Sequence, residues 1–224
     1  MAIITRAARW CQSPVGVWTF CTAQSKTVSV TAVPRPRSFS TETAVDAAIE
    51  RFRGGTFSAT STEELCDCTG LSRSSFYNAF GSKSELFRTA LARYGETQDR
   101  NRAEFVCGAG TGREQLEALL RETIRLQFET PDHRPCLVLS ASVELGRSDD
   151  EIADLARRNL NAFAQTITEL IERGQCDGSI TSRVPAADLA AMLHAMVNGL
   201  QIRGRVCDDD VAIQSTIDTA LRLL

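Results

Sequence analysis

The segment SRSSFYNAF, residues 72–80, is rich in side chains that form hydrogen bonds. Its serines, arginine, tyrosine and asparagine can donate or accept hydrogen bonds, and none of them titrates near neutral pH. On a helix with 100° per residue, the two phenylalanines and Ala79 fall on one side and most polar side chains on the other, with Arg73 beside the apolar stripe. The chemistry available to this segment is therefore hydrogen bonding to a polar partner.

Residues that support catalysis or metal binding are few in this chain. It has two histidines, His133 and His194, no Ser-His-Asp or Glu-x-x-His grouping and no glycine-rich phosphate loop. Its eight cysteines include no Cys-x-x-Cys, and Cys66 and Cys68 on one helix would point about 200° apart. We therefore expect reduced thiols, no metal, no cofactor and no enzymatic activity, and we place His194 in the core.

The elements that must position residues 72–80 are helices, because apolar residues recur at helical spacing from Thr41 onward and no strand-like alternation persists. Capping boxes are expected at Thr60 with Glu63 and at Ser82 with Glu85. The sequence predicts an all-α fold with four short helices up to about Gly95. The longer helices expected after them cover residues 112–130, 136–145, 149–173, 185–203 and 209–223.

Charge is distributed unevenly along the chain. The net charge is -3, but residues 1–40 hold five cations and no acid, and residues 41–100 hold seven cations against nine acids. No domain is strongly basic, so binding to nucleic acid would have to use a small set of contacts. No stretch approaches the ~18 apolar residues that span a membrane, and we expect a cytoplasmic protein without a membrane partner.

The short polar helix has the geometry of a helix-turn-helix. A helix of about nine residues is unstable alone and must dock by its aromatic stripe, and Gly70 supplies a turn before it. A major groove about 12 Å wide admits such a helix. Lys83 lies in the first turn of the next helix, where the helix dipole disfavours a cation, so a phosphate partner would suit it. The same geometry also fits a polar helix that only covers a bundle.

The residues themselves narrow this choice. The segments AVDAAIERF, FSATSTEELCDCTGLSRSSFYNAFGSKSELF and ALARY resemble the DNA-binding domain of the TetR family of bacterial regulators, over about residues 41–95. The resemblance implies a supporting helix at 62–68, a recognition helix at 72–80, and phosphate contacts from Tyr77 and Lys83. The DNA contacts that it implies are Thr60, Ser61, Ser72, Arg73, Ser74, Ser75, Tyr77, Asn78 and Lys83.

The same resemblance implies a C-terminal helical domain that binds an effector and dimerises. Helices 185–203 and 209–223 would form the dimer interface, with intramolecular packing as the alternative. We expect an apolar small molecule between the C-terminal helices. Candidate ligand contacts are Phe128, Cys136, Phe163 and Met192.

Cys136 carries a second hypothesis. The segment RPCLVLSASVELG resembles one that occurs in a TetR subset with redox-responsive members. His133 and Arg134 precede the cysteine, and the start of a helix favours a thiolate. The alternative to a ligand-responsive repressor is therefore a repressor that senses oxidants or electrophiles through Cys136.

We expect three parts: a disordered or mis-called leader at 1–38, a DNA-binding domain at 39–99, and an effector-binding and dimerisation domain at 100–224. The predicted function is a homodimeric transcriptional repressor that binds a near-palindromic double-stranded operator and is released by a small molecule. Two readings from other classes stay open, a helical enzyme with a scaffold module at its N-terminus and an interaction protein without DNA binding.

Overall fold

The chain divides into two compact units, Met1–Ser38 and Phe39–Leu224. The computed structural model describes residues 10–12, 18–20, 40–130, 132–207 and 210–224. In the first unit β1 (Trp10–Gln12) and β2 (Trp18–Phe20) pair antiparallel. Three-residue strands are too short to show an alternation, so the sequence did not indicate them. The rest of the leader predicted over residues 1–38 lies outside the described residues.

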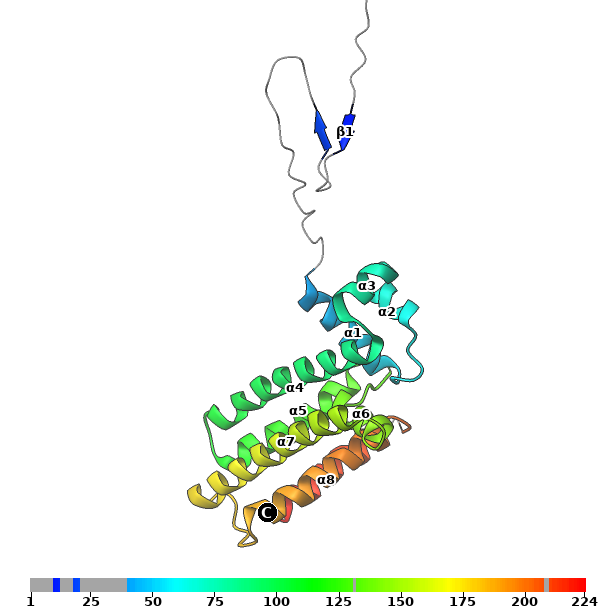
Figure 1. The fold of residues 1–224 in the computed structure, drawn as a ribbon. Helices are drawn as coiled ribbons and strands as arrows, with labels where there is room; N and C mark the ends of the chain where they lie inside the picture. The colour runs from blue at the N-terminus through cyan, green and yellow to red at the C-terminus, as the bar shows by residue number, and fades with distance from the viewer. Residues whose placement is uncertain (1–9, 13–17, 21–39, 131, 208–209) are drawn as a thin grey trace, which may run out of the picture. The chain divides into compact units, whose positions relative to one another are not determined.

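All regular structure in the described part of the second unit is helical, which confirms the all-α prediction (Figure 1). The helices are α1 (Thr41–Gly54), α2 (Thr62–Thr69), α3 (Arg73–Phe80), α4 (Lys83–Cys107), α5 (Gly112–Phe128), α6 (Leu137–Leu145), α7 (Asp150–Asp177), α8 (Ala186–Gly204) and α9 (Asp210–Arg222). Most bounds lie within a few residues of those expected.

The capping box of α2 lies one residue later than predicted. Ser61 is the N-cap, and its hydroxyl accepts a hydrogen bond from the N–H of Glu64 at 3.1 Å, while the Glu64 carboxylate accepts from the N–H of Ser61 at 2.7 Å. Thr60 is instead fully buried, and its hydroxyl donates to the carbonyl oxygen of Thr56 at 2.8 Å. The cap at Ser61 thus sets where α2 begins.

Helix α4 is longer than predicted because Gly95 does not end it. Gly95 is buried where α4 crosses α7, and a Cβ there would lie 2.6 Å from Nδ2 and 2.8 Å from Cγ of Asn159. The glycine therefore allows a close approach of two helices. As a result, α4 runs without a break through the domain boundary predicted at residues 99 and 100.

Two hydrophobic cores hold the second unit together. One contains residues of α1 to α4, together with Leu137, Val138 and Ala141 of α6 and Ile152 and Ala156 of α7. The other is formed by α5, the later part of α7, α8 and α9. Helix α6 thus packs with the N-terminal helices, although the sequence placed it in the C-terminal domain.

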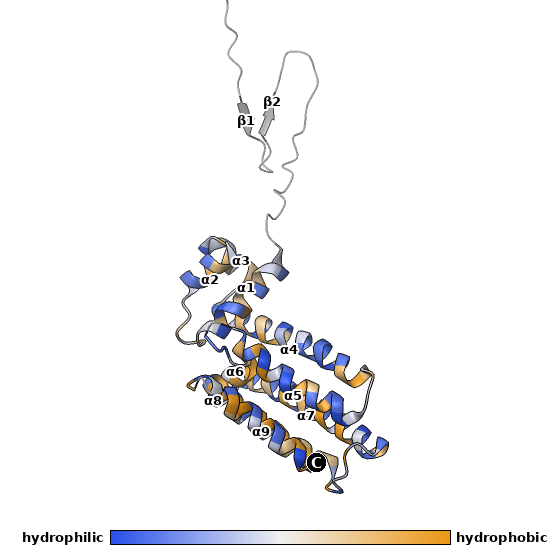
Figure 2. Cartoon of the chain, turned by 180° about the vertical axis from the view of Figure 1, so that it is seen from behind, coloured by the Kyte–Doolittle hydropathy of each residue, from blue (hydrophilic) through white to orange (hydrophobic). Residues whose placement is uncertain are grey.

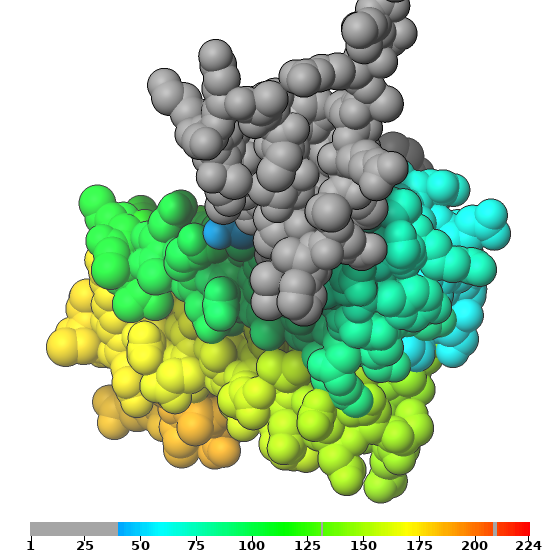
Figure 3. Space-filling model, turned by 45° about the horizontal axis from the view of Figure 1, so that its top comes forward, coloured from blue at the N-terminus to red at the C-terminus, as the bar shows by residue number. Residues whose placement is uncertain are grey.

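The second unit carries α2 and α3 at one end, and its long helices differ in polarity. In the space-filling view α2 and α3 (cyan to teal) lie at one end and the last turns of α7 (yellow) at the other (Figure 3). Helix α8 is largely hydrophobic, whereas the second half of α4 is largely hydrophilic (Figure 2). Within the described residues, no helix combines the length and apolar character needed to cross a membrane.

Candidate nucleic-acid interface and cavity

The polar side chains of α3 face outward, as the helical wheel predicts. Phe76 is fully buried and Phe80 is 8% exposed, whereas Tyr77 is 48% exposed and stacks edge-on against Phe76 at 5.5 Å between ring centroids. Ser72, Arg73, Ser74 and Asn78 are also exposed, and Ser75 is half-buried. Ala79, expected on the apolar side, is exposed. The helix therefore offers a narrow polar ridge that could enter a groove.

The first turn of α3 gathers three hydroxyl groups. The Ser72 hydroxyl accepts a hydrogen bond from the N–H of Ser75 at 3.2 Å and donates to the Ser75 hydroxyl at 2.9 Å. The hydroxyls of Ser72 and Ser74 lie 3.1 Å apart. Arg73 is the single cation of the sequence between residues 54 and 82, and it is exposed. Hydroxyls, one guanidinium and a helix N-terminus suit phosphate oxygens.

Lys83 is already engaged within the protein. Its ammonium donates to the carbonyl oxygens of Phe57 at 2.8 Å and Thr60 at 2.9 Å, and it lies 4.3 Å from the centre of the Phe57 ring. Two of its three donors are thus used, so its cationic position in the first turn of α4 has an intramolecular explanation. The phosphate contact expected from Lys83 stays a prediction.

Two further predicted contacts lie beside this lysine. Thr60 is buried and hydrogen-bonded, so its side chain is not available to DNA and the prediction for Thr60 is wrong. Ser61 is exposed, but its hydroxyl caps α2. The face of α3 and Ser61 are the predicted contacts that remain open to a partner.

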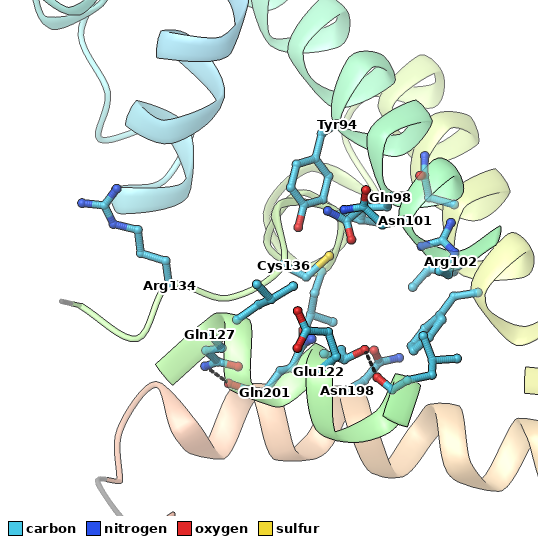
Figure 4. A pocket seen from close by; sticks show the side chains of 18 of the residues that line it. Tyr94, Gln98, Asn101, Arg102, Glu122, Gln127, Arg134, Cys136, Asn198 and Gln201 are labelled. Carbon is cyan, nitrogen blue, oxygen red and sulfur yellow. Dashed lines mark hydrogen bonds between the residues drawn. The ribbon is translucent and has the colours of Figure 1, made fainter. Parts of the chain in front are cut away.

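A cavity of about 620 Å³ lies among α4, α5, α7 and α8, with the N-terminal part of α6 on one wall (Figure 4). Its lining is mixed rather than apolar. The polar residues that line it include Gln98, Asn101, Arg102, Glu104, Glu122, Thr123, Gln127, Asn159, His194, Asn198 and Gln201, and the apolar ones include Phe105, Leu119, Val138, Leu139, Leu160 and Phe163.

Several buried polar atoms at this cavity have no hydrogen-bond partner among the described residues. Gln127 is 3% exposed; its amide nitrogen donates to the carbonyl oxygens of His133 at 3.1 Å and Gln201 at 2.8 Å, which leaves its Oε1 as an unpaired acceptor. Oε1 of Gln201 and Oδ1 of Asn159 are also buried acceptors without a hydrogen-bond partner among the described residues. A buried acceptor without a donor costs about 1–3 kcal/mol, so the cavity favours an occupant that donates hydrogen bonds.

His194 belongs to the cavity and not to the closed core predicted for it. Its ring stands edge-on to Phe163 at 5.2 Å, and its Nε2 is buried without a partner in the described chain. Burial lowers the pKa of His194, and the charge of Arg102 lowers it further. The histidine is therefore held in its neutral form, as an additional hydrogen-bonding group on the cavity wall.

Cys136 lines the cavity next to Tyr94, whose hydroxyl is directed toward the thiol (Figure 4). Burial raises the pKa of Tyr94 well above its ordinary value, and Cys136 raises it further. Arg134 is turned away from the thiol and donates to the backbone oxygen of Glu50, and the His133 ring packs on Phe128 at 4.6 Å. His133 and Arg134 therefore do not supply the cationic surroundings expected around Cys136.

Comparisons with known proteins match both halves of the chain to one family. Residues 44–90 match the model of bacterial regulatory proteins of the tetR family, and residues 112–220 match a tetracyclin repressor-like C-terminal domain. The chain is 31% identical over 155 residues to the HTH-type transcriptional repressor BdcR of Escherichia coli strain K12, covering 67% of this chain and 77% of BdcR. The chain belongs to the TetR family. It is therefore a DNA-binding transcriptional regulator with a helix-turn-helix.

Other relatives of this TetR-family chain are also transcriptional regulators. An uncharacterized HTH-type regulator, YezE of Bacillus subtilis strain 168, is 24% identical over 194 residues, covering 85% of this chain and 98% of YezE. A cysteine variant of the TetR-family regulator CifR, solved with a 26-base-pair operator DNA, is 29% identical with a TM-score of 0.73, covering 84% of this chain and 98% of that one.

Two of the four predicted ligand contacts line the cavity of this TetR-family protein, namely Cys136 and Phe163. Phe128 packs against Gly204 and His133 outside the lining, and Met192 is exposed on the other side of α8. The residues that prediction missed are polar ones, among them Gln127. Gln127 follows Leu120 and Ile124 in an otherwise apolar helical stripe, and a polar residue in such a stripe was the available signal.

The helices expected to form the dimer interface, α8 and α9, divide their apolar residues between the protomer's own core and its surface. Six leucines and isoleucines of these helices are buried in the protomer's own core: Leu189, Leu193, Leu200, Ile213, Ile217 and Leu221. The exposed apolar residues of this region are Met192, Ile202, Val206, Val211 and Leu223. Met192, Met196 and Leu223 also border a shallow groove between α8 and α9.

Proposed function

We propose that this chain is a homodimeric TetR-family repressor that binds a near-palindromic operator through α3 and is released by a small molecule in the cavity. The observation that carries the DNA-binding part is the division of α3 into a buried aromatic side and an exposed polar ridge. The proposed contacts are Ser61, Ser72, Arg73, Ser74, Ser75, Tyr77 and Asn78, with Lys83 as a phosphate contact through its remaining donor.

The proposed contacts suit a protein without a strongly basic domain. With one exposed cation on α2 and α3, hydroxyl, amide and backbone N–H groups must supply most of the hydrogen bonds to phosphates. Binding should then depend on salt less steeply than that of a protein with a basic patch, because fewer counterions are released. Specificity would come from the few side chains of α3 that reach base edges, above all Asn78.

The dimer is supported by the apolar outer face of α8 and α9. Met192, Ile202, Val211 and Leu223 are large apolar side chains between 46% and 81% exposed, and such residues are favoured in the buried centre of homodimer interfaces. A two-fold dimer through these helices would present two copies of α3 to two half-sites.

The proposed effector is polar. The wall carries unpaired acceptors on Gln127, Gln201 and Asn159 and a neutral His194, together with Phe105 and Phe163 as flat apolar surfaces. A molecule with hydrogen-bond donors and an apolar body fits this lining better than the wholly apolar effector expected from the sequence.

The thiol of Cys136 supports one alternative, in which the repressor responds to oxidants or electrophiles. The thiol lines the cavity and is therefore within reach of a bound electrophile. Because Arg134 and His133 are directed elsewhere, we expect a mild oxidant to affect the wild type and Cys136→Ser alike. Release of the wild type alone from DNA would favour the thiol mechanism.

A mobility shift with DNA that flanks the protein's own gene tests the proposal. We expect a discrete complex that excess unrelated DNA does not compete away and that contains two protomers. A chain that binds all sequences equally would fit neither specific repression nor a recognition role for α3, and a chain that binds none would support an interaction protein or an enzyme.

A further inference from the structure

One carboxylate of α6 holds the connection between α1 and α2, residues 55–61. Oε2 of Glu144 accepts a hydrogen bond from the N–H of Phe57 at 2.7 Å, and Oε1 accepts one from the N–H of Ser58 at 2.7 Å. Each carboxylate oxygen thus binds one backbone amide, across more than 80 residues of sequence. Hydrogen bonds to an ionised acceptor are about twice as strong as neutral ones, so this is a firm attachment.

Lys83 binds the carbonyl groups of the same connection. Its ammonium donates to the backbone oxygens of Phe57 and Thr60. Burial raises the pKa of Glu144, but the hydrogen bonds from Ser58 and Phe57 and the charge of Lys83 outweigh burial, so the pKa lies below its ordinary value. Glu144 is therefore ionised at neutral pH, and the connection is bound by an anion at its amides and a cation at its carbonyls.

The attached connection leads directly into the helix-turn-helix. Phe57 packs against Phe52 of α1 and Phe87 of α4, with ring centroids 6.4 Å and 5.1 Å away. Ser61, the N-cap of α2, follows only four residues after Phe57. A shift of the connection would therefore shift α2, and α3 with it.

The other end of α6 lies at the cavity. Cys136, the N-cap of α6, lines the cavity together with Val138 and Leu139 of the first turn. Helix α6 is only nine residues long and packs chiefly against α7, with further contacts to α1 and α4. The same short helix thus borders the cavity at one end and binds the α1–α2 connection at the other.

We propose that Glu144 is a positioning residue for DNA binding, which fixes α2 and α3 relative to the effector-binding helices. This inference rests on the proposed function. Two recognition helices of a dimer must match two half-sites about 34–36 Å apart. Without the attachment at Glu144, the two helices keep their base contacts but hold their spacing less firmly.

The experiment compares full-length wild type, Glu144→Gln and Glu144→Ala on the DNA sequence that wild type enriches from a random pool. The same sequence is also tested with one base pair added or removed between its half-sites. Glu172→Ala is the matched control, because Glu172 is exposed on α7 and its loss removes the same charge. Amide hydrogen exchange at Phe57 and Ser58 reports directly on the attachment.

We expect Glu144→Ala to bind the native spacing about tenfold more weakly and to discriminate much less between the three spacings. Glu144→Gln keeps the size of the side chain and one carbonyl acceptor, so this variant should lose less affinity for DNA than Glu144→Ala. Removing a negative charge would by itself tighten binding to DNA, so a weaker complex cannot come from net charge. Exchange at the two amides should rise in both variants and stay unchanged in the control.

The outcomes separate the inference from the proposed function. If wild type enriches a sequence but Glu144→Ala keeps its affinity and its spacing preference, the positioning role is overturned and the proposed function stands. If wild type enriches no sequence, the proposed function fails and the positioning role fails with it. Should Glu144→Ala not fold, Glu144→Gln carries the same comparison, and an unaltered spacing preference in that variant, with raised exchange at both amides, overturns the inference.

Discussion

The DNA-binding helices and the cavity are built from different kinds of contact. Helices α2 and α3 are defined by local features, namely the caps at Ser61 and Ser72 and the left-handed Gly70 between the helices. The cavity is made where α4, α5, α7 and α8 meet, and its polar groups are left partly unpaired. The first region is thus organised to present a fixed surface, and the second to accept a ligand.

The largest change in stability should come from Phe76, the buried ring that docks α3 on the first core. Phe76→Ala removes a fully buried ring from the first core and should lower the free energy of unfolding by about 3–5 kcal/mol. Chemical denaturation measures this change. The exposed neighbour Asn78→Ala is the control and should change stability by at most about 0.5 kcal/mol. Equal effects of the two substitutions would mean that α3 is not docked by its aromatic side.

A smaller loss of stability is expected when a glycine at a helix crossing is replaced by alanine. A Cβ at Gly112 would lie 2.6 Å from the backbone of Gly174 and of Leu170, which cannot move aside, so Gly112→Ala should cost about 1–3 kcal/mol. Gly95→Ala meets only the side-chain amide of Asn159, which can rotate, and should cost less. Thermal unfolding of the two variants gives the order, and the reverse order would contradict the described crossings.

A third prediction concerns the single cation of the polar ridge. Arg73→Ala should weaken binding to all DNA sequences alike and reduce the slope of log K against log salt by about one unit for each phosphate that is no longer neutralised, hence about two units in a dimer. Arg157→Ala removes the same charge from an exposed site on α7 and should leave the slope unaltered. An unchanged slope in Arg73→Ala would exclude a phosphate contact.

The smallest predicted change in stability concerns His194 on the cavity wall. Because burial holds the pKa of His194 below 6.5, the unfolded chain binds more protons than the folded chain below that pH. Stability should therefore fall as the pH drops from 7.5 to 5.5, and it should fall less in His194→Gln. Thermal unfolding at the two pH values measures the difference, and identical pH dependence in both proteins would show that His194 is not held neutral.

The difference between the two regions explains what the sequence could predict. Caps, glycine turns and the aromatic stripe act over a few residues, so α2, α3 and most of their exposed polar side chains follow from the sequence. The role of Gly95 depends on Asn159 of a distant helix, and that of Lys83 depends on the carbonyl oxygens of the α1–α2 connection. These partners are set by tertiary packing, which no local pattern encodes.

The cavity residues were missed for the same reason. A polar residue in an apolar helical stripe marks Gln127 and Gln201 as unusual, but their partners appear only where α5 and α8 meet. The family match covers the whole helix-turn-helix and not single residues of α3. The recognition role of α3 is therefore the claim that a direct experiment should address first.

The most direct test is selection of bound DNA from a random pool with full-length wild type and with Asn78→Ala. Wild type should enrich one near-palindromic sequence with two equal half-sites. Asn78→Ala, which leaves the fold intact, should enrich a palindrome with the same spacing but with altered bases at one or two positions in each half-site. Enrichment of the same sequence by both proteins, or of none by wild type, would contradict the assignment of α3 as the recognition helix.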